Sequence, residues 1–297
     1  LPKRAMNQLE EIRIRTDTDT LLISGGREYS LRDRDEITAE VLEEILNRLL
    51  DYSYYAYEEE LARGYITIEG GHRVGICGRV TLENGQVHLI KDVSSLNIRR
   101  SREITGSSDK ILGAVLSPAK TPPEGVQNAG VSAAITEMNV RNTLIISPPK
   151  CGKTTILRDL ARSLSCRGFR IGICDERSEI AGCYDGKTSY DLGPRTDVLD
   201  GCPKAEGILM LIRAMSPDVV LTDEIGKPED AAAIRSALSA GLKIITTIHG
   251  SSFEDAAKSA VGDLITDRVF ETLIFLSAQP VTGTVEKILQ LPEVSHG

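Results

Sequence analysis

The sequence predicts an α/β protein in which a predominantly parallel sheet covered by helices is preceded by a small α+β domain. Past residue 140, apolar strand-like segments alternate with segments whose apolar residues recur at helical spacing. This alternation is typical of parallel sheets. Before residue 117, short strand-like segments surround one amphipathic stretch. The 297 residues are enough for two modest domains.

The expected organisation is an N-terminal α+β domain at 1–116, a linker at 117–140 and a larger α/β domain at 141–297. In the first domain, Thr38 is in position to cap a helix that runs to Leu50. Turn-forming pairs such as Asn84-Gly85 separate the strands. The strands are expected at 12–15, 20–24, 27–31, 65–69, 72–80, 86–91 and 94–99. The linker begins with a stretch rich in Pro and small polar residues.

In the second domain the expected strands and helices alternate along the chain. Strands are expected at 143–147, 170–174, 218–223, 243–248, 270–277 and 284–290. Helices are expected at 153–166, 204–214, 228–240 and 253–260.

Composition narrows the class of protein. The net charge of −8 and an aromatic content of 4% without Trp argue against a nucleic-acid-binding surface. The sequence has six cysteines, and no two of them are separated by the two residues typical of zinc or redox motifs. We therefore expect reduced thiols and a cytoplasmic protein. The longest apolar run, Ile208–Ile212, is far shorter than the roughly 20 residues of a membrane span.

The clearest motif lies between an apolar strand and a helix and predicts a phosphate-binding loop. Backbone N–H groups and a helix N-terminus together bind anions. Lys153 would reach the β- and γ-phosphates of ATP, and Thr154 would hold Mg²⁺. The residues expected to bind the nucleotide are Ser147, Pro148, Pro149, Lys150, Cys151, Gly152, Lys153, Thr154 and Thr155.

Two positions depart from the usual phosphate-loop pattern. Ser147 stands where the first Gly belongs, and Lys150 stands where a Gly or small residue is common. If Lys150 adopts a positive φ, it is strained by about 1 kcal/mol. Alternatively, its ammonium adds positive charge beside the phosphates, and the sequence leaves both accounts open.

Three further strand ends carry polar groups. Asp223 and Glu224 follow an apolar strand, where Asp223 would bind Mg²⁺ through water and Glu224 would activate the attacking water. His249 ends another strand and would sense the γ-phosphate. In 175–179, Glu176 is expected to help hold the metal's waters. Parallel strands place their carboxyl ends at one edge, where α/β proteins bind ligands.

These motifs resemble those of the RecA-like secretion and pilus ATPases of type II and type IV systems. In those families an acidic box, an Mg²⁺-binding acidic pair and a His box follow the phosphate loop, and here these are 175–179, 223–224 and 246–249. The resemblance extends to the stage III sporulation protein AA family over nearly the whole chain and is weakest across 105–142. The segments that carry it are Ser147–Thr155, Asp175–Gly182, Gly193–Gly207, Leu211–Gly226, Tyr54–Leu61, Gly70–Arg79 and Lys91–Arg100.

The resemblance implies a RecA-like P-loop ATPase with ATP and Mg²⁺ as cofactors. It also implies a homo-oligomer, expected to be a hexamer. This would serve the cytoplasmic, mother-cell side of a channel complex used in endospore formation and associate with the membrane through partner proteins. A ring would let an arginine act on a neighbour's nucleotide. Arg79, Arg99 and Arg195 are the preferred candidates because they fall in resembling segments.

Two other functions stay open at this stage. RecA-like cores also serve nucleic-acid-handling ATPases. Some relatives carry a nucleic-acid-binding module with an Arg shortly before a His. Here no Arg stands four residues before any of the four His, so we expect no nucleic-acid partner. The unusual Ser147 and Lys150 keep open a nucleotide-gated scaffold with negligible turnover.

Overall fold

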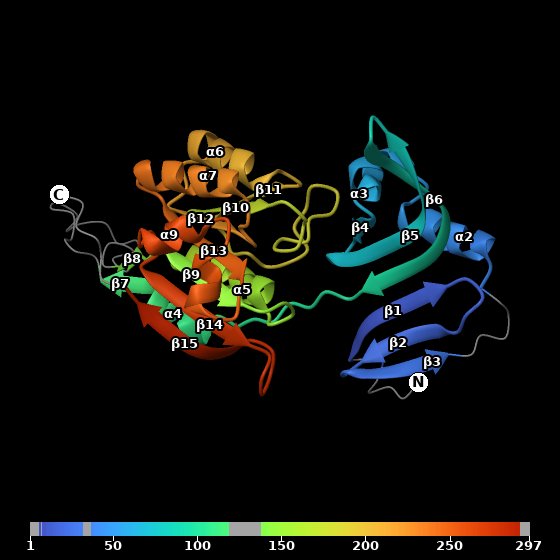
Figure 1. Ribbon diagram of the computed structural model, residues 1–297, viewed down its shortest axis with the longest axis horizontal. Helices are drawn as coiled ribbons and strands as arrows, with labels where there is room; N and C mark the ends of the chain where they lie inside the picture. Colours follow the sequence, from blue (N-terminus) through green and yellow to red (C-terminus); the bar gives the residue numbers. More distant parts are fainter. Residues whose placement is uncertain (1–5, 7, 32–36, 119–137, 292–297) are drawn as a thin grey trace. The chain divides into compact units, whose positions relative to one another are not determined.

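Two units make up the chain. The computed structural model, shown in Figure 1, describes residues 6, 8–31, 37–118 and 138–291. The first unit comprises Leu1–Arg102 with Gly182–Tyr190, and the second comprises Glu103–Ala181 with Asp191–Gly297. The division after Arg102 comes earlier than the expected boundary after residue 116. The reason is that α4 (Asp109–Val115) packs against two strands of the second unit's sheet.

The first unit is a six-stranded antiparallel sheet with helices against it, which confirms the expected α+β architecture. Its helices are α2 (Ala39–Leu49), the 3₁₀ turn η1 (Tyr54–Tyr57) and α3 (Glu58–Ala62). Its strands, in sheet order, are β3 (Arg27–Leu31), β2 (Thr20–Ser24), β1 (Leu9–Arg15), β6 (Gln86–Arg99), β5 (His72–Glu83) and β4 (Tyr65–Ile68).

Local signals in this unit act as the sequence predicts. The hydroxyl of Thr38 accepts the backbone N–H of Val41 and caps α2, which buries Leu42 and Leu46 in the core. Asn84 and Gly85 both have positive φ, at 51° and 80°, and form the hairpin turn between β5 and β6.

The separate strands expected at 86–91 and 94–99 are instead one strand, β6. A shift of register at Asp92, whose φ is 47°, interrupts the pairing without ending the strand. Gly78 on β5 makes this possible, because a Cβ there would lie 2.5 Å from the carbonyl oxygen of Lys91. The break that the sequence predicts between 91 and 94 is therefore a bulge within one strand.

The second unit is built on a seven-stranded, largely parallel sheet. In order, its strands are β11 (Thr196–Asp200), β10 (Ile171–Asp175), β12 (Val219–Thr222), β13 (Lys243–His249), β9 (Thr143–Ser147), β14 (Thr272–Ser277) and β15 (Thr284–Gln290). Only β15 pairs antiparallel to its neighbour. The central strands are buried on both faces, as parallel strands covered by helices must be.

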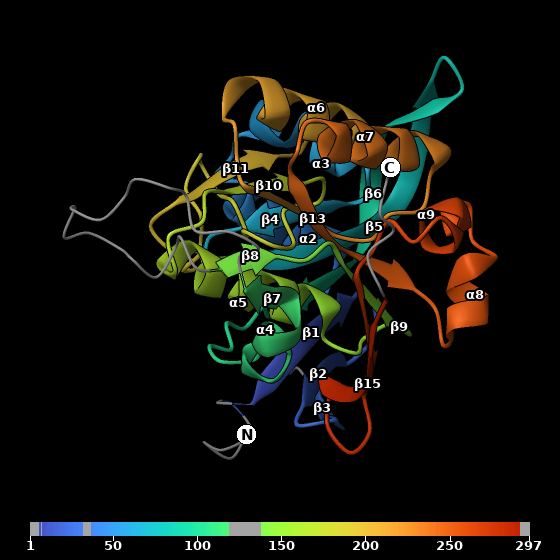
Figure 2. The same ribbon diagram turned by 90° about the vertical axis from the view of Figure 1, so that its left-hand side faces the viewer.

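Helices cover both faces of this sheet. Figure 2 shows α6 (Lys204–Ala214) and α7 (Pro228–Ser239) on one face and α5 (Lys153–Cys166) on the other. Two short helices, α8 (Phe253–Ala257) and α9 (Gly262–Thr266), replace the single helix expected at 253–260. Strand β11 was not expected, because none of its residues is buried and three of the five are polar or charged.

Most of the expected linker, residues 119–137, lies outside the described residues. Its flanks are not loops, because β7 (Leu116–Pro118) and β8 (Met138–Val140) pair antiparallel. Within the part of the chain that the structure describes, no helix is both long and apolar enough to cross a membrane.

Two glycines explain why 182–190 belongs to the first unit. A Cβ at Gly71 would lie 2.3 Å from the hydroxyl oxygen of Tyr190, and a Cβ at Gly182 would lie 2.5 Å from the same ring. The Tyr190 hydroxyl is within 3.3 Å of the Gly71 carbonyl oxygen and donates to it. The side chain therefore packs directly on the backbone of the β4–β5 turn.

This packing predicts unequal effects of adding a methyl group at two glycines of positive φ. Gly71→Ala should lower the free energy of unfolding by about 2–4 kcal/mol, from backbone strain and overpacking against Tyr190. Gly85→Ala is the matched control: its φ is 80°, nothing lies within 4 Å of a Cβ there, and we expect a loss of about 1 kcal/mol. Urea unfolding of both variants measures the difference. Equal losses would contradict the packing described here.

Candidate functional site

The phosphate-loop segment joins β9 to α5 in the geometry that the motif requires. Gly152 has a φ of 84° and precedes the first residue of α5. Lys150 also adopts the left-handed conformation, with a φ of 62°, so the premise of the strain account is met. A Cβ at Gly152 would lie 3.2 Å from the Thr282 methyl group, so only glycine fits here without displacing a neighbour.

The ammonium of Lys153 lies inside this loop. It donates to the carbonyl oxygens of Ser147 (2.9 Å) and Pro148 (3.1 Å), and the Ser147 hydroxyl also accepts from it at 3.2 Å. Ser147 thus supplies a hydroxyl ligand where a glycine would supply none. Burial lowers the pKa of the Lys153 ammonium, and the charge of Glu224 opposes that effect.

His249 links Lys153 to Glu224. Its Nδ1 lies 2.9 Å from the Lys153 ammonium, and its Nε2 lies 2.9 Å from Oε1 of Glu224. An ammonium can only donate, so Nδ1 accepts and the ring proton sits on Nε2, which donates to the carboxylate. The β9–β13 register sets this arrangement, because it places Ser147 directly beside His249.

Glu224 is held in a strained backbone conformation. Its φ is 33°, in the left-handed region that disfavours a side chain. The Thr247 side chain accepts the Glu224 N–H at 2.8 Å, and the Thr247 carbonyl accepts the N–H of Ile225. Such strain clusters at functional sites because the surrounding structure must hold it there.

Asp175 is the last residue of β10 and Asp223 directly follows the neighbouring strand β12, and both are nearly inaccessible to solvent. Burial raises the pKa of Asp223 to about 6, although the charge of Lys204 opposes it. Oδ1 of Asp223 is buried and makes no hydrogen bond. Asp175 instead accepts three backbone N–H groups, from Glu179, Ile180 and Ala181, at 2.8–2.9 Å. Asp175 therefore shapes the loop after β10, whereas Oδ1 of Asp223 accepts no hydrogen bond.

Glu176, expected to help hold a metal, instead bonds to Lys204. Lys204 also lies 3.7 Å from Oδ1 of Asp223. Burial lowers the pKa of Lys204, but the charges of Asp223 and Glu176 outweigh burial and hold it above its usual value. Sequence analysis missed this lysine. The available signal was a lysine at the first position of a helix, where the helix dipole disfavours a cation.

The three candidate arginines belong to other segments of the chain. Arg79 and Arg99 are exposed on β5 and β6 of the first unit, and Arg79 pairs with Asp92 at 2.9 Å. Arg195 immediately precedes β11, and its carbonyl accepts the N–H of Ile171. It therefore lies at the amino edge of the sheet, opposite the edge that holds the phosphate loop. The structure does not bring Arg195 to Lys153 of its own chain.

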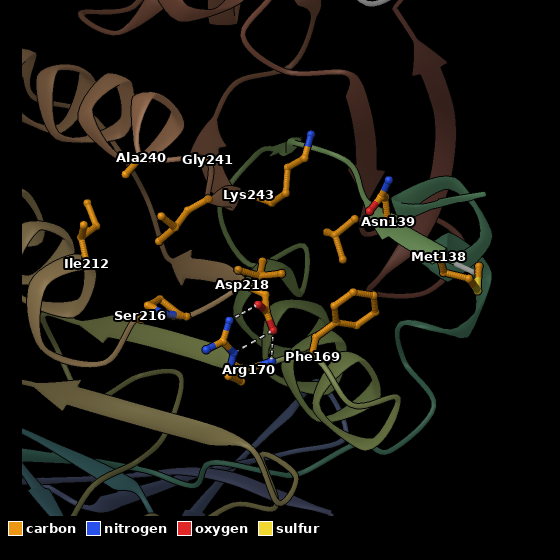
Figure 3. Close-up of a pocket in the computed structure, with 14 residues that line it drawn as sticks. Met138, Asn139, Phe169, Arg170, Ile212, Ser216, Asp218, Ala240, Gly241 and Lys243 are labelled. Atoms are coloured by element: carbon orange, nitrogen blue, oxygen red, sulfur yellow. Dashed lines mark hydrogen bonds and ion pairs between the residues drawn. The ribbon is translucent and has the colours of Figure 1, made fainter. Parts of the chain in front are cut away.

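Cavities lie at both edges of the sheet. One of about 600 Å³ lies at the amino ends of β10, β12 and β13, and the Arg170–Asp218 ion pair contributes to its lining (Figure 3). Another, of about 370 Å³, lies at the carboxyl edge, and its lining includes Lys204, Glu224 and His249. Open α/β sheets bind ligands at the carboxyl edge. We therefore place the candidate site there.

The residues at this edge fit a nucleotide with Mg²⁺. The loop supplies a left-handed glycine, a helix N-terminus and a buried ammonium, which together suit a phosphate. Oδ1 of Asp223, which is buried and accepts no hydrogen bond, is an acceptor suited to the waters of a magnesium ion. Thr154 follows Lys153 in the first turn of α5. Glu176 fits less well, because lysine already neutralises it.

Comparison with known proteins shows the family of the chain and agrees with its fold. A family model described as "Sporulation stage III, protein AA" matches residues 2–292. Stage III sporulation protein AA of Bacillus subtilis (strain 168) is 44% identical over 295 residues, which covers 97% of this chain and 89% of that protein.

Solved structures show the same fold at low identity. The pilus retraction motor PilT, solved with bound ADP, has a TM-score of 0.62 at 13% identity and covers 99% of this chain and 82% of its own. The Legionella pneumophila ATPase DotB has a TM-score of 0.54 at 16% identity and covers 91% of this chain and 73% of its own. The fold is thus that of the RecA-like secretion ATPases, and the chain belongs to the sporulation stage III protein AA family.

Proposed function

We propose that this protein is an ATP-hydrolysing motor on the cytoplasmic, mother-cell side of a secretion-like channel complex used in endospore formation. The observation that carries the ATPase proposal is the connected series Lys153–His249–Glu224. It joins Lys153, which would bind the phosphates, to Glu224, which directly follows the proposed magnesium-binding residue Asp223. The family membership supports the sporulation role, and the likeness to PilT and DotB supports a motor.

In the proposed reaction the loop and the strand ends have separate tasks. Lys153 exchanges its contacts with the loop carbonyls for contacts with oxygens of the β- and γ-phosphates. This exchange also ends the contact between Lys153 and Nδ1 of His249, so that His249 can sense the γ-phosphate. Mg²⁺ supplies charge neutralisation of the phosphates, with Thr154 and Asp223 as the residues that would hold it. Glu224 takes the proton of the attacking water, and the Nε2–H of His249 orients its carboxylate.

We further propose that the chain acts as a homo-oligomeric ring, a hexamer, that reaches the membrane through partner proteins. No nucleic-acid partner is proposed, in keeping with the net charge of −8. In such a ring Arg79, Arg99 or Arg195 would act on the nucleotide of a neighbouring subunit. The distance of Arg195 from the phosphate loop of its own chain, at the other edge of the sheet, supports action between subunits for that arginine.

The catalytic proposal predicts the behaviour of Glu224→Gln. The amide still accepts from His249 but cannot take a proton, so ATP binding should persist while turnover falls about 10²–10⁴-fold. Calorimetry and phosphate release, with and without single-stranded DNA, measure both, and we expect DNA to leave turnover unchanged. Unchanged turnover in the variant would rule out Glu224 as the base. Stimulation by DNA would favour a nucleic-acid-handling ATPase, and absence of turnover in the wild type would favour a gated scaffold.

The two accounts of Lys150 predict different affinities for ATP. We expect Lys150→Gln and Lys150→Gly to weaken ATP binding alike, and more at low salt, because both remove the ammonium. Relief of strain would instead make Lys150→Gly tighten binding, by about fivefold, with Lys150→Gln unchanged. Calorimetry at two salt concentrations separates them. Lys153→Ala, which we expect to abolish ATP binding, is the reference for loss of binding. Equal affinities of the wild type and both Lys150 variants at both salt concentrations would reject both accounts.

The ring proposal predicts that two inactive variants complement each other. Arg195→Ala lacks the group given to a neighbour, whereas Glu224→Gln lacks a group used in its own subunit. In randomly mixed rings about one quarter of the sites would have both groups, so turnover should return on mixing. Arg79→Ala and Arg99→Ala are tested in the same way. A mixture of Lys153→Ala with Glu224→Gln should stay inactive, and no recovery with any arginine variant would exclude that arginine.

A further inference from the structure

A buried lysine occupies the space between two carboxylates of the proposed metal site. Lys204 is only 6% exposed, and its ammonium bonds to Glu176 and lies 3.7 Å from Oδ1 of Asp223. That oxygen belongs to a residue that is 4% exposed, and it makes no hydrogen bond. The lysine thus balances the charge of Asp223 while leaving its oxygen without a donor.

The backbone fixes this position. A Cβ at Gly207 of α6 would lie 2.3 Å from the sulfur of Cys174, and a Cβ at Gly172 of β10 would lie 3.3 Å from Leu211 of α6. The helix therefore lies closely against β10, which brings its first residue, Lys204, to the end of that strand. A side chain that could swing into solvent would not be held in this way.

The charged form of Lys204 is unfavourable at this position by itself, which indicates that the nearby carboxylates stabilise it. A buried ammonium loses its hydration, and a helix N-terminus disfavours a cation. Only close carboxylates offset both effects, and removal of one member of such a group leaves an uncompensated buried charge. A divalent cation that approaches Asp223 in the absence of other ligands meets the same ammonium and is repelled by it.

We propose that Lys204 is an internal counter-ion that makes metal binding depend on nucleotide. It occupies the Glu176–Asp223 pair, so that a divalent cation does not bind there by itself. The cation binds only when phosphate oxygens bring additional negative charge. Lys204 is therefore a positioning residue for the metal. This inference rests on the proposed function for the location of the metal, and its experiment omits nucleotide, so the two can fail separately.

The test titrates the full chain with Mn²⁺, a probe for Mg²⁺, in the absence of nucleotide. The paramagnetic resonance signal of free Mn²⁺ reports binding. Lys204→Met, which keeps an apolar chain of similar length, should bind Mn²⁺ at least about tenfold more tightly than the wild type, because the buried Asp223 and the partly buried Glu176 lose their cation. Lys204→Arg should behave like the wild type. The proposal is overturned if the wild type already binds as tightly as Lys204→Met.

Lys227 provides the matched control. Its ammonium lies 3.9 Å from Glu176, but its side chain is 68% exposed and screened by solvent. Lys227→Met should therefore leave Mn²⁺ affinity unchanged. A gain equal to that of Lys204→Met would show that general charge, rather than the buried position, sets the affinity, and would overturn the proposal.

A second variant keeps the test decisive if Lys204→Met does not fold by itself. In that case Mn²⁺ should restore its folding and raise its melting temperature, with no such effect on the wild type, because the metal replaces the missing charge. Lys204→Met combined with Glu176→Gln should fold without metal and bind Mn²⁺ as weakly as the wild type. Lack of rescue by Mn²⁺, or a full gain in the double variant, would contradict the role assigned to Lys204.

Discussion

The parallel pairing of β10, β12, β13 and β9 is the constraint on which the site depends. The register places Thr222 beside Thr246 and Ser147 beside His249, so residues distant in sequence meet at one edge. These strands are buried on both faces and can carry ionisable groups only where they end. The fold therefore collects charge at the carboxyl edge, and the helices that cover the sheet decide which cations reach it.

Two buried ammonium groups, those of Lys153 and Lys204, lie at the carboxyl edge and have different partners. Lys153 is bound by neutral acceptors, two carbonyls, a hydroxyl and an imidazole, and so has no carboxylate in direct contact. Lys204 lies against carboxylates instead. An anionic ligand displaces neutral acceptors from an ammonium group more easily than it displaces carboxylates. Lys153 is therefore the group suited to bind phosphate. Lys204 is suited to hold the protein's own acidic residues.

Two of the non-glycine residues with a positive φ belong to the candidate site. Lys150 and Glu224 both have left-handed conformations that a glycine would adopt more easily. At Glu224 the Thr247 side chain and the sheet hold the backbone in place, and His249 holds the carboxylate. A glycine at either position would relieve strain but remove the charged group. The proposed chemistry explains why side chains stand there.

The sequence by itself determined the elements that rest on local chemistry. Helical spacing, the Thr38 cap and the Asn84-Gly85 turn predicted their structures, and the strand–loop–helix order around Lys153 predicted the phosphate loop. The strand ends also predicted that Asp223, Glu224 and His249 would share one edge, because parallel pairing aligns such ends.

Only the tertiary structure decided what those ends contact. The pairing of Glu176 with Lys204 depends on how closely α6 approaches β10 through Gly172 and Gly207, and no local pattern encodes a contact across 28 positions. The placement of 182–190 on the first unit depends likewise on Tyr190 meeting a glycine turn. Spacing and propensity act over a few residues, whereas the partner of a buried charge is set by packing between elements distant in the chain.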